Sequence, residues 1–140
     1  MKTITIEEYL MGRVEFTTLL SAQQTNIIQL LQRVNNLLAE FGEYRAVSSG
    51  YRTMEDHLRI YKEINEKKKA KGLPEVKIPM GSKHLVGAAC DLVDKDDRLK
   101  KFCTEAILKK YDLYMEHGDY TDTWCHLQTT KTSQRIFKPY

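Results

Sequence analysis

The sequence has few of the features that mark exported, membrane-spanning or disulfide-rich proteins. It has three cysteines in 140 residues, an odd number without Cys-x-x-Cys spacing, so we expect reduced thiols in a cytosolic context. No apolar run is long enough to cross a bilayer. The first residues alternate and then turn acidic instead of forming the apolar segment of a signal peptide. We therefore expect a protein that is made in the cytoplasm and does not insert into a membrane.

Linker-like segments and a broad basic surface are also missing. The seven glycines and three prolines form no stretch that divides the chain, and this length suits one domain with a substantial core. The net charge of +3 comes largely from the lysines of residues 67–71, a run too local for a nucleic-acid interface. We interpret that run as a solvated helix end and expect no nucleic-acid partner. The alternative interpretation is that these lysines contact an anionic polymer.

Helical periodicity dominates the first part of the chain. Ser21 and Gln24 have the spacing of a capping box, and the apolar residues that follow recur at helical spacing until Gly42. Thr53 is expected to cap another helix, because acidic residues follow it in what would be the first turn. Because the helical spacing ends at Gly42, residues 1–42 are expected to form N-terminal helices that pack on the rest of the domain.

Short strand-like runs occupy the second half. Residues 44–49, 88–93 and 124–128 are rich in β-branched, small or aromatic side chains. A helix is expected over about 94–108, and the apolar pair 136–137 in the polar tail is expected to lie across the sheet edge. The pattern predicts an α+β domain with a small antiparallel sheet flanked by helices.

Three metal-capable side chains fall in or beside these strands. Asp91 lies in a buried-strand pattern, where a carboxylate needs a cation, a metal or strong donors. His84 precedes it and His126 lies in the last strand-like run, which completes a catalytic type of zinc set with one open position. Cys90 and Cys125 neighbour these ligands and should point to the opposite face as small core residues. The alternative is that the two histidines and the aspartate are satisfied core residues without metal.

A longer motif surrounds the first two of these residues. Residues 82–91 fit S-x-H-x-x-G-x-A-x-D at every specified position, the zinc signature of the D-alanyl-D-alanine carboxypeptidase and L-alanyl-D-glutamate endopeptidase family, which the chain resembles. Residues 49–52 are similar to that family's S-x-x-R segment and 124–126 to its W-x-H segment, so the resemblance covers about 48–128. It implies a hedgehog-like α+β fold and a single zinc peptidase-like domain over residues 1–140. Among the family, the chain is most similar to phage and prophage members.

The resemblance also implies roles for individual residues. Zinc would be held by His84, Asp91 and His126. Arg52 would stabilise the oxyanion or bind a substrate carboxylate, the alternative being an ion pair with an acid near the helix start. Ser82 would hydrogen-bond the substrate or order the ligand loop, the alternative being a turn cap. The implied activity is hydrolysis of peptide bonds in peptidoglycan stem peptides, by a carboxypeptidase or an endolysin-like endopeptidase.

The chain departs from the family at the general base. Family members typically carry Glu or Asp three positions before the last zinc histidine, where this chain has Thr123. Asp122 is the predicted base, although it reaches the metal only through a bulge or turn, since four strand residues span about 13 Å. Asp119, Glu116 and His117 are the alternatives, and the base can also be absent.

A protein without a base would belong to a different functional class. The rival hypothesis is a catalytically impaired zinc-bearing module that binds the cell wall or serves in a virion, with other virion proteins as partners. In either case the expected place of action is the cell wall, reached after release from the cell or as part of a virion. The sequence does not identify the bond cleaved or the oligomeric state.

Overall fold

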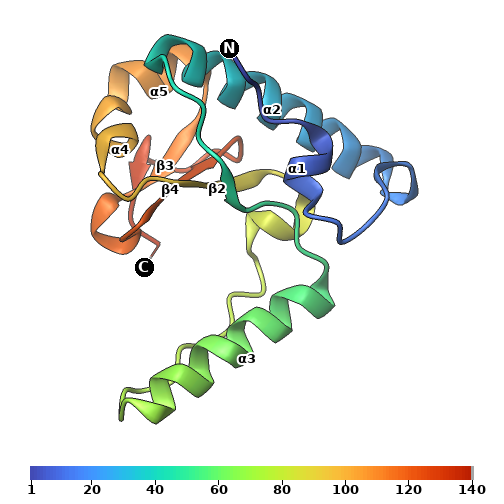
Figure 1. The fold of residues 1–140 in the computed structure, drawn as a ribbon, viewed down its shortest axis with the longest axis vertical. Helices are drawn as coiled ribbons and strands as arrows, with labels where there is room; N and C mark the ends of the chain where they lie inside the picture. Colours follow the sequence, from blue (N-terminus) through green and yellow to red (C-terminus); the bar gives the residue numbers. More distant parts are fainter. Residues whose placement is uncertain (140) are drawn as a thin grey trace.

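The computed structural model describes residues 1–139 as an α+β fold in which helices pack beside one mixed sheet (Figure 1). The helices are α1 (Ile6–Leu10), α2 (Ser21–Phe41), α3 (Met54–Ala70), α4 (Arg98–Phe102) and α5 (Glu105–Tyr111). The strands are β1 (Val47–Ser49), β2 (Ala89–Val93), β3 (Tyr114–Glu116), β4 (Trp124–Gln128) and β5 (Ile136–Phe137). Short 3-10 helices cover Phe16–Thr18, Lys83–Val86 and Gly118–Tyr120. The predicted fold class is therefore confirmed.

The five strands form one open sheet in the order β1-β2-β4-β3-β5. All neighbouring strands are antiparallel except β3 and β5, which are parallel. Residues 136–137 thus lie at the sheet edge, as expected, and there they form the edge strand β5. In the central pair, Asp91 of β2 lies directly opposite His126 of β4, so the register of the sheet brings two candidate ligands together.

The hydrophobic core lies between α2 and one face of the sheet. α2 contributes six buried apolar side chains, and the sheet contributes alternate residues of β2, β3 and β4: Ile27, Leu30, Leu31, Val34, Leu37, Leu38, Cys90, Leu92, Met115, Cys125 and Leu127. Burying each large apolar side chain contributes about 1.5–3 kcal/mol. Because side chains alternate along a strand, the residues between these core positions project from the opposite face. All three cysteines are free and buried, which confirms Cys90 and Cys125 as core residues.

Two expectations about helix boundaries are corrected. The N-cap of α2 is Leu20 and not Ser21, because the side chain of Gln23 accepts a hydrogen bond from the backbone N–H of Leu20. The helix expected over 94–108 is divided into α4 and α5. Thr104 lies at the division, where its hydroxyl accepts from the N–H of Ile107 and starts a new helix, an alternative to continuing the first one.

Helix α3 projects from the body of the protein together with the segment that returns from its end (Figure 1). Thr53 caps it as predicted, accepting a hydrogen bond from the N–H of Asp56. Asn65 holds the return segment through two hydrogen bonds with the backbone of Val76. His57 is buried at the base of the projection, where its Nε2 donates to the carbonyl of Pro79. Within residues 1–139, no helix has the length and apolarity to cross a membrane.

Candidate metal centre

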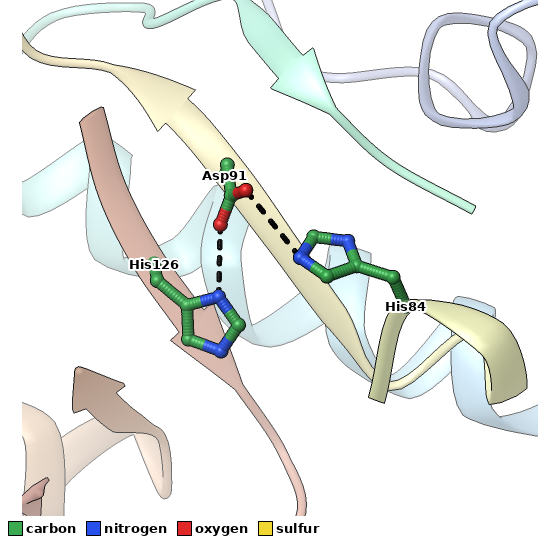
Figure 2. Close-up of side chains that lie close together, drawn as sticks. All are labelled: His84, Asp91 and His126. Atoms are coloured by element: carbon green, nitrogen blue, oxygen red, sulfur yellow. Dashed lines mark hydrogen bonds and ion pairs between the residues drawn. The ribbon is translucent and has the colours of Figure 1, made fainter. Parts of the chain in front are cut away.

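Three separate elements bring His84, Asp91 and His126 together (Figure 2). His84 comes from the 3-10 helix Lys83–Val86, Asp91 from β2 and His126 from β4. One potential ligand atom from each residue lies within 4.8 Å of the other two. The structure therefore assembles the three residues that the sequence motif singled out, in an arrangement that could hold a metal ion.

A glycine sets the position of His84 relative to the strand. Gly87 ends the 3-10 helix with φ 76°, a left-handed conformation that favours glycine. A Cβ on Gly87 would lie 2.7 Å from Cγ1 of Ile27 in α2. The turn therefore packs directly on the core helix, and this contact fixes where the ligand loop enters β2.

The carboxylate of Asp91 lies between the two imidazoles. Its Oδ1 is 2.8 Å from Nδ1 of His126 and its Oδ2 is 3.4 Å from Nε2 of His84. Figure 2 shows one carboxylate oxygen directed at each ring. These are the atoms that a metal ion would share, since one nitrogen of each histidine and the carboxylate face a common point.

The other nitrogen of each imidazole is held by an oxygen acceptor. Nδ1 of His84 donates to the carbonyl of Gly50 at 2.8 Å, and Nε2 of His126 donates to Oε1 of Gln128 at 2.8 Å. The amide of Gln128 is itself oriented, because its Nε2 donates to the carbonyl of Thr130. Such outer partners fix the tautomer and ring orientation of metal-binding histidines. Nε2 of His84 and Nδ1 of His126 are thus the nitrogens available to a metal, and the donor set fits a cation.

Gly50 and Gln128 are members of the site that the sequence analysis did not assign. Gln128 lies two residues after His126 in β4, and period-2 alternation places the two side chains on one face. That spacing alone predicts that the side chain of Gln128 lies near His126. The backbone carbonyl of Gly50 carries no side-chain signal, so its contact with His84 depends on the tertiary structure.

Charge coupling within the site shifts two pKa values. Burial opposes ionisation of Asp91, but His84 and His126 beside it lower the pKa of its carboxyl well below the ordinary value. Burial likewise opposes charging of His126, yet the hydrogen bond and charge of Asp91 raise the pKa of that imidazole. A cation at the point between the rings would replace the proton that this arrangement favours.

Arg52 lies beside the ligand loop and does not form the ion pair considered as its alternative. Its backbone N–H donates to the carbonyl of His84. Its Nε and Nη2 donate to Oγ of Ser49, and its Nη1 donates to Nδ1 of His57. Across residues 1–139, no carboxylate forms a salt bridge with Arg52; Asp56, near the start of α3, instead pairs with arginines 13 and 59.

Within residues 1–139, no hydrogen bond or ion pair joins the side chain of Ser82 or Asp122 to the three candidate ligands. Ser82 precedes the 3-10 helix but its side chain makes no capping hydrogen bond, so the turn-cap alternative is not formed. Asp122 is exposed, and its backbone carbonyl accepts from Nζ of Lys100. Contact of Ser82 with substrate and the role of Asp122 as base both stay predictions.

Glu116 is the acidic alternative that lies on the site side of the sheet. It ends β3, the strand adjacent to β4, and it is half-buried. Burial raises the pKa of its carboxyl, as does Asp91, while His126 lowers it. By contrast, Asp119 is exposed, and its backbone N–H donates to Nδ1 of His117 within the 3-10 helix region.

One of three comparisons with known proteins identifies a family. A search of curated proteins and a search of solved structures each found no match. The model of the VanY family, described as D-alanyl-D-alanine carboxypeptidase, matches residues 21–131. This range includes all three candidate ligands, Arg52 and the whole sheet except β5. The chain therefore belongs to the VanY family of D-alanyl-D-alanine carboxypeptidases.

Proposed function

We propose that the protein is a zinc-dependent peptidase that hydrolyses peptide bonds in peptidoglycan stem peptides. One observation carries the proposal: one potential ligand atom from each of His84, Asp91 and His126 lies within 4.8 Å of the other two. The carboxylate of Asp91 faces Nε2 of His84 and Nδ1 of His126. The outer hydrogen bonds to Gly50 and Gln128 support it, because they prepare both rings as ligands. The family supports the substrate class, a peptidoglycan peptide.

The ligand chemistry favours zinc over harder cations. Two imidazoles and one carboxylate are a typical catalytic zinc set, whereas magnesium and calcium prefer oxygen ligands. Zinc held by His84, Asp91 and His126 would lower the pKa of a water in its open position and polarise the scissile carbonyl. The neutral imidazoles and single carboxylate leave a net positive charge at the site, which suits both tasks.

Arg52 is suited to bind the negative charge of the substrate or transition state. Its guanidinium has five N–H donors, and within the described chain three nitrogens make the contacts with Ser49 and His57. Each Nη carries a second N–H, and these two donors can bind a planar carboxylate or an oxyanion. The contacts with Ser49 and His57 would hold the fork in place during this step. Ser82, which begins the ligand loop, would add a hydrogen bond to the substrate.

The proposal is tested by product analysis. The zinc-loaded protein is incubated with purified sacculi and with a stem pentapeptide ending in D-alanyl-D-alanine, and products are identified by mass. Release of D-alanine identifies a carboxypeptidase, and release of larger stem fragments identifies an endolysin-like endopeptidase. We expect His84→Ala to abolish release, and chelation of the wild type to abolish it until zinc is restored. Absence of product at full zinc occupancy would overturn the proposal.

Thr123 motivates a second candidate function. A family carboxylate is replaced there, so a zinc-bearing module that binds the cell wall without cleaving it, alone or with virion proteins, is the rival. It predicts binding to sacculi without fragment release, and no gain of hydrolysis in Thr123→Glu. A phage or prophage origin would suit both candidates, which would act on the wall after release from the cell or within a virion.

A further inference from the structure

The register of the sheet places an unassigned carboxylate next to the candidate metal centre. Tyr114 pairs with Gln128 and Met115 with Leu127 between β3 and β4. Continuing this antiparallel register by one pair places Glu116 opposite His126. Directly opposed residues have Cβ atoms about 4.5–5.5 Å apart, so a glutamate side chain there reaches the space in front of the imidazole.

Alternation along the strands confirms which face Glu116 occupies. Met115 and Leu127 belong to the hydrophobic core, so their neighbours Glu116 and His126 project from the other face. Asp91 projects from that same face of β2, between the core residues Cys90 and Leu92. Glu116, His126 and Asp91 thus form a row across three adjacent strands, β3, β4 and β2.

On the side away from β4, Glu116 has an apolar neighbour. Phe137 of β5 pairs with Glu116 in the parallel β3–β5 ladder. The ring of Phe137 also lies 6.0 Å from the ring of His126, edge to face. Phe137 therefore lies on the sheet-edge side of Glu116, while β4 with His126 lies on its other side.

The carboxylate of Glu116 has no hydrogen bond or salt bridge to any residue in 1–139. The charged groups that face it are His126 and Asp91, and no lysine or arginine is paired with it. A half-buried carboxylate without a partner is costly unless a ligand or water satisfies it. Burial raises the pKa of Glu116 above its ordinary value, as expected of a carboxylate in such a setting.

We propose that Glu116 is the catalytic general base, in place of the carboxylate that Thr123 replaces. This inference rests on the proposed peptidase function. Glu116 takes a proton from the attacking water as the water oxygen bonds to the scissile carbonyl carbon. When the C–N bond breaks, Glu116 passes that proton to the leaving amine. Peptide and water are thereby converted to a carboxylic acid and an amine, with Glu116 regenerated.

Glu116 fits this role better than the other candidates. Asp122 is exposed, and its carbonyl, like that of Thr121, is bound by Lys100. The turn that carries it is therefore anchored on the α4 side. His117 uses Nδ1 to accept from the N–H of Asp119, a contact within its own turn. Only Glu116 among these residues adjoins a ligand in the sheet.

The test compares Glu116→Gln with two matched acid-to-amide variants. Asp122→Asn removes the rival base, and Glu105→Gln removes an exposed carboxylate paired with Lys109. We expect Glu116→Gln to lower kcat by about 10²–10⁴-fold while zinc content and KM stay close to wild type. Glu116→Asp should recover part of the activity. Neither Asp122→Asn nor Glu105→Gln should approach this loss.

A second measurement does not depend on turnover. A phosphinate analogue of D-alanyl-D-alanine places an anionic tetrahedral group where the reacting carbonyl would lie. When this anion binds beside Glu116, the protein should take up about one proton. Calorimetry in two buffers with different ionisation enthalpies measures this uptake. Glu116→Gln should bind the analogue without this uptake, whereas Asp122→Asn should retain it.

These outcomes test the assignment of Glu116 as base separately from the proposed peptidase function. If the wild type hydrolyses stem peptide and Glu116→Gln retains its kcat and proton uptake, the base assignment is wrong and the proposed function stands. The same holds if Asp122→Asn shows the loss instead, or if Glu116→Gln loses zinc and thereby proves structural. If the zinc-loaded wild type cleaves no stem peptide, the proposed function fails and the base assignment fails with it.

Discussion

Oδ1 of Asp91 lies 2.8 Å from Nδ1 of His126, and the two residues are directly opposed in the antiparallel pair of β2 and β4. Backbone hydrogen bonds of the sheet therefore hold two of the three candidate ligands. His84 is different, because it enters from a 3-10 helix whose position depends on the turn at Gly87. The stability of that turn should decide whether the third ligand stays in place.

Gly87→Ala should destabilise the fold. The new Cβ would lie 2.7 Å from Cγ1 of Ile27, at a residue with φ +76°, so we expect a loss of about 1–3 kcal/mol in the free energy of unfolding. Gly81→Ala is the matched control, because a Cβ at Gly81 has nothing within 4 Å. Urea unfolding measures both variants. Equal stability of Gly87→Ala and Gly81→Ala would contradict this account of the turn.

Gln128→Ala should weaken zinc binding without removing a ligand. The substitution takes away the acceptor for Nε2 of His126, which lies 2.8 Å from Oε1 of Gln128. Loss of such an outer partner typically lowers metal affinity by about 10–100-fold. Competition with a chromophoric chelator measures the affinity, with exposed Gln32→Ala as the control. An unchanged affinity would mean that Gln128 does not orient the ring.

Zinc affinity should fall as the pH is lowered. Asp91 raises the pKa of His126 above its ordinary value, against the opposing effect of burial. A raised pKa means that the protonated ring persists to higher pH, so below that pKa a proton must leave Nδ1 before zinc binds. The affinity should fall by about tenfold for each pH unit in this range. A chelator titration across pH gives the slope; a flat profile would exclude His126 as a ligand.

Arg52→Lys should impair catalysis while zinc is retained. A lysine ammonium keeps the charge but loses the fork that contacts Ser49 and His57 and offers two further donors. We expect kcat/KM for stem peptide to fall by about 10²–10³-fold, with zinc content unchanged. Arg59→Lys, at an exposed position of α3, is the control. Activity close to wild type in Arg52→Lys would remove Arg52 from the proposed mechanism.

The sequence by itself determined the candidate ligand set, because the information is local. Residues 82–91 carry His84 and Asp91 within one motif, and His126 lies in a strand that its composition identifies. Helix α2 and its end at Gly42 also follow from local signals, namely apolar spacing and a left-handed glycine with φ 91°. The N-cap of α2 and the division at Thr104 do not follow from local signals, because several polar residues near each boundary can act as caps.

Only the tertiary structure decided which acid stands beside His126. Alternation within one strand predicts which of its residues share a face, and on that basis it favours Asp122 as the base. Alternation does not predict which strands pair or in what register, since those depend on contacts between distant segments. The pairing of β3 with β4 brings Glu116 beside the ligands from ten positions earlier in the chain. The hydrogen bond from His84 to the carbonyl of Gly50 was decided in the same way, because a backbone acceptor has no side-chain signature.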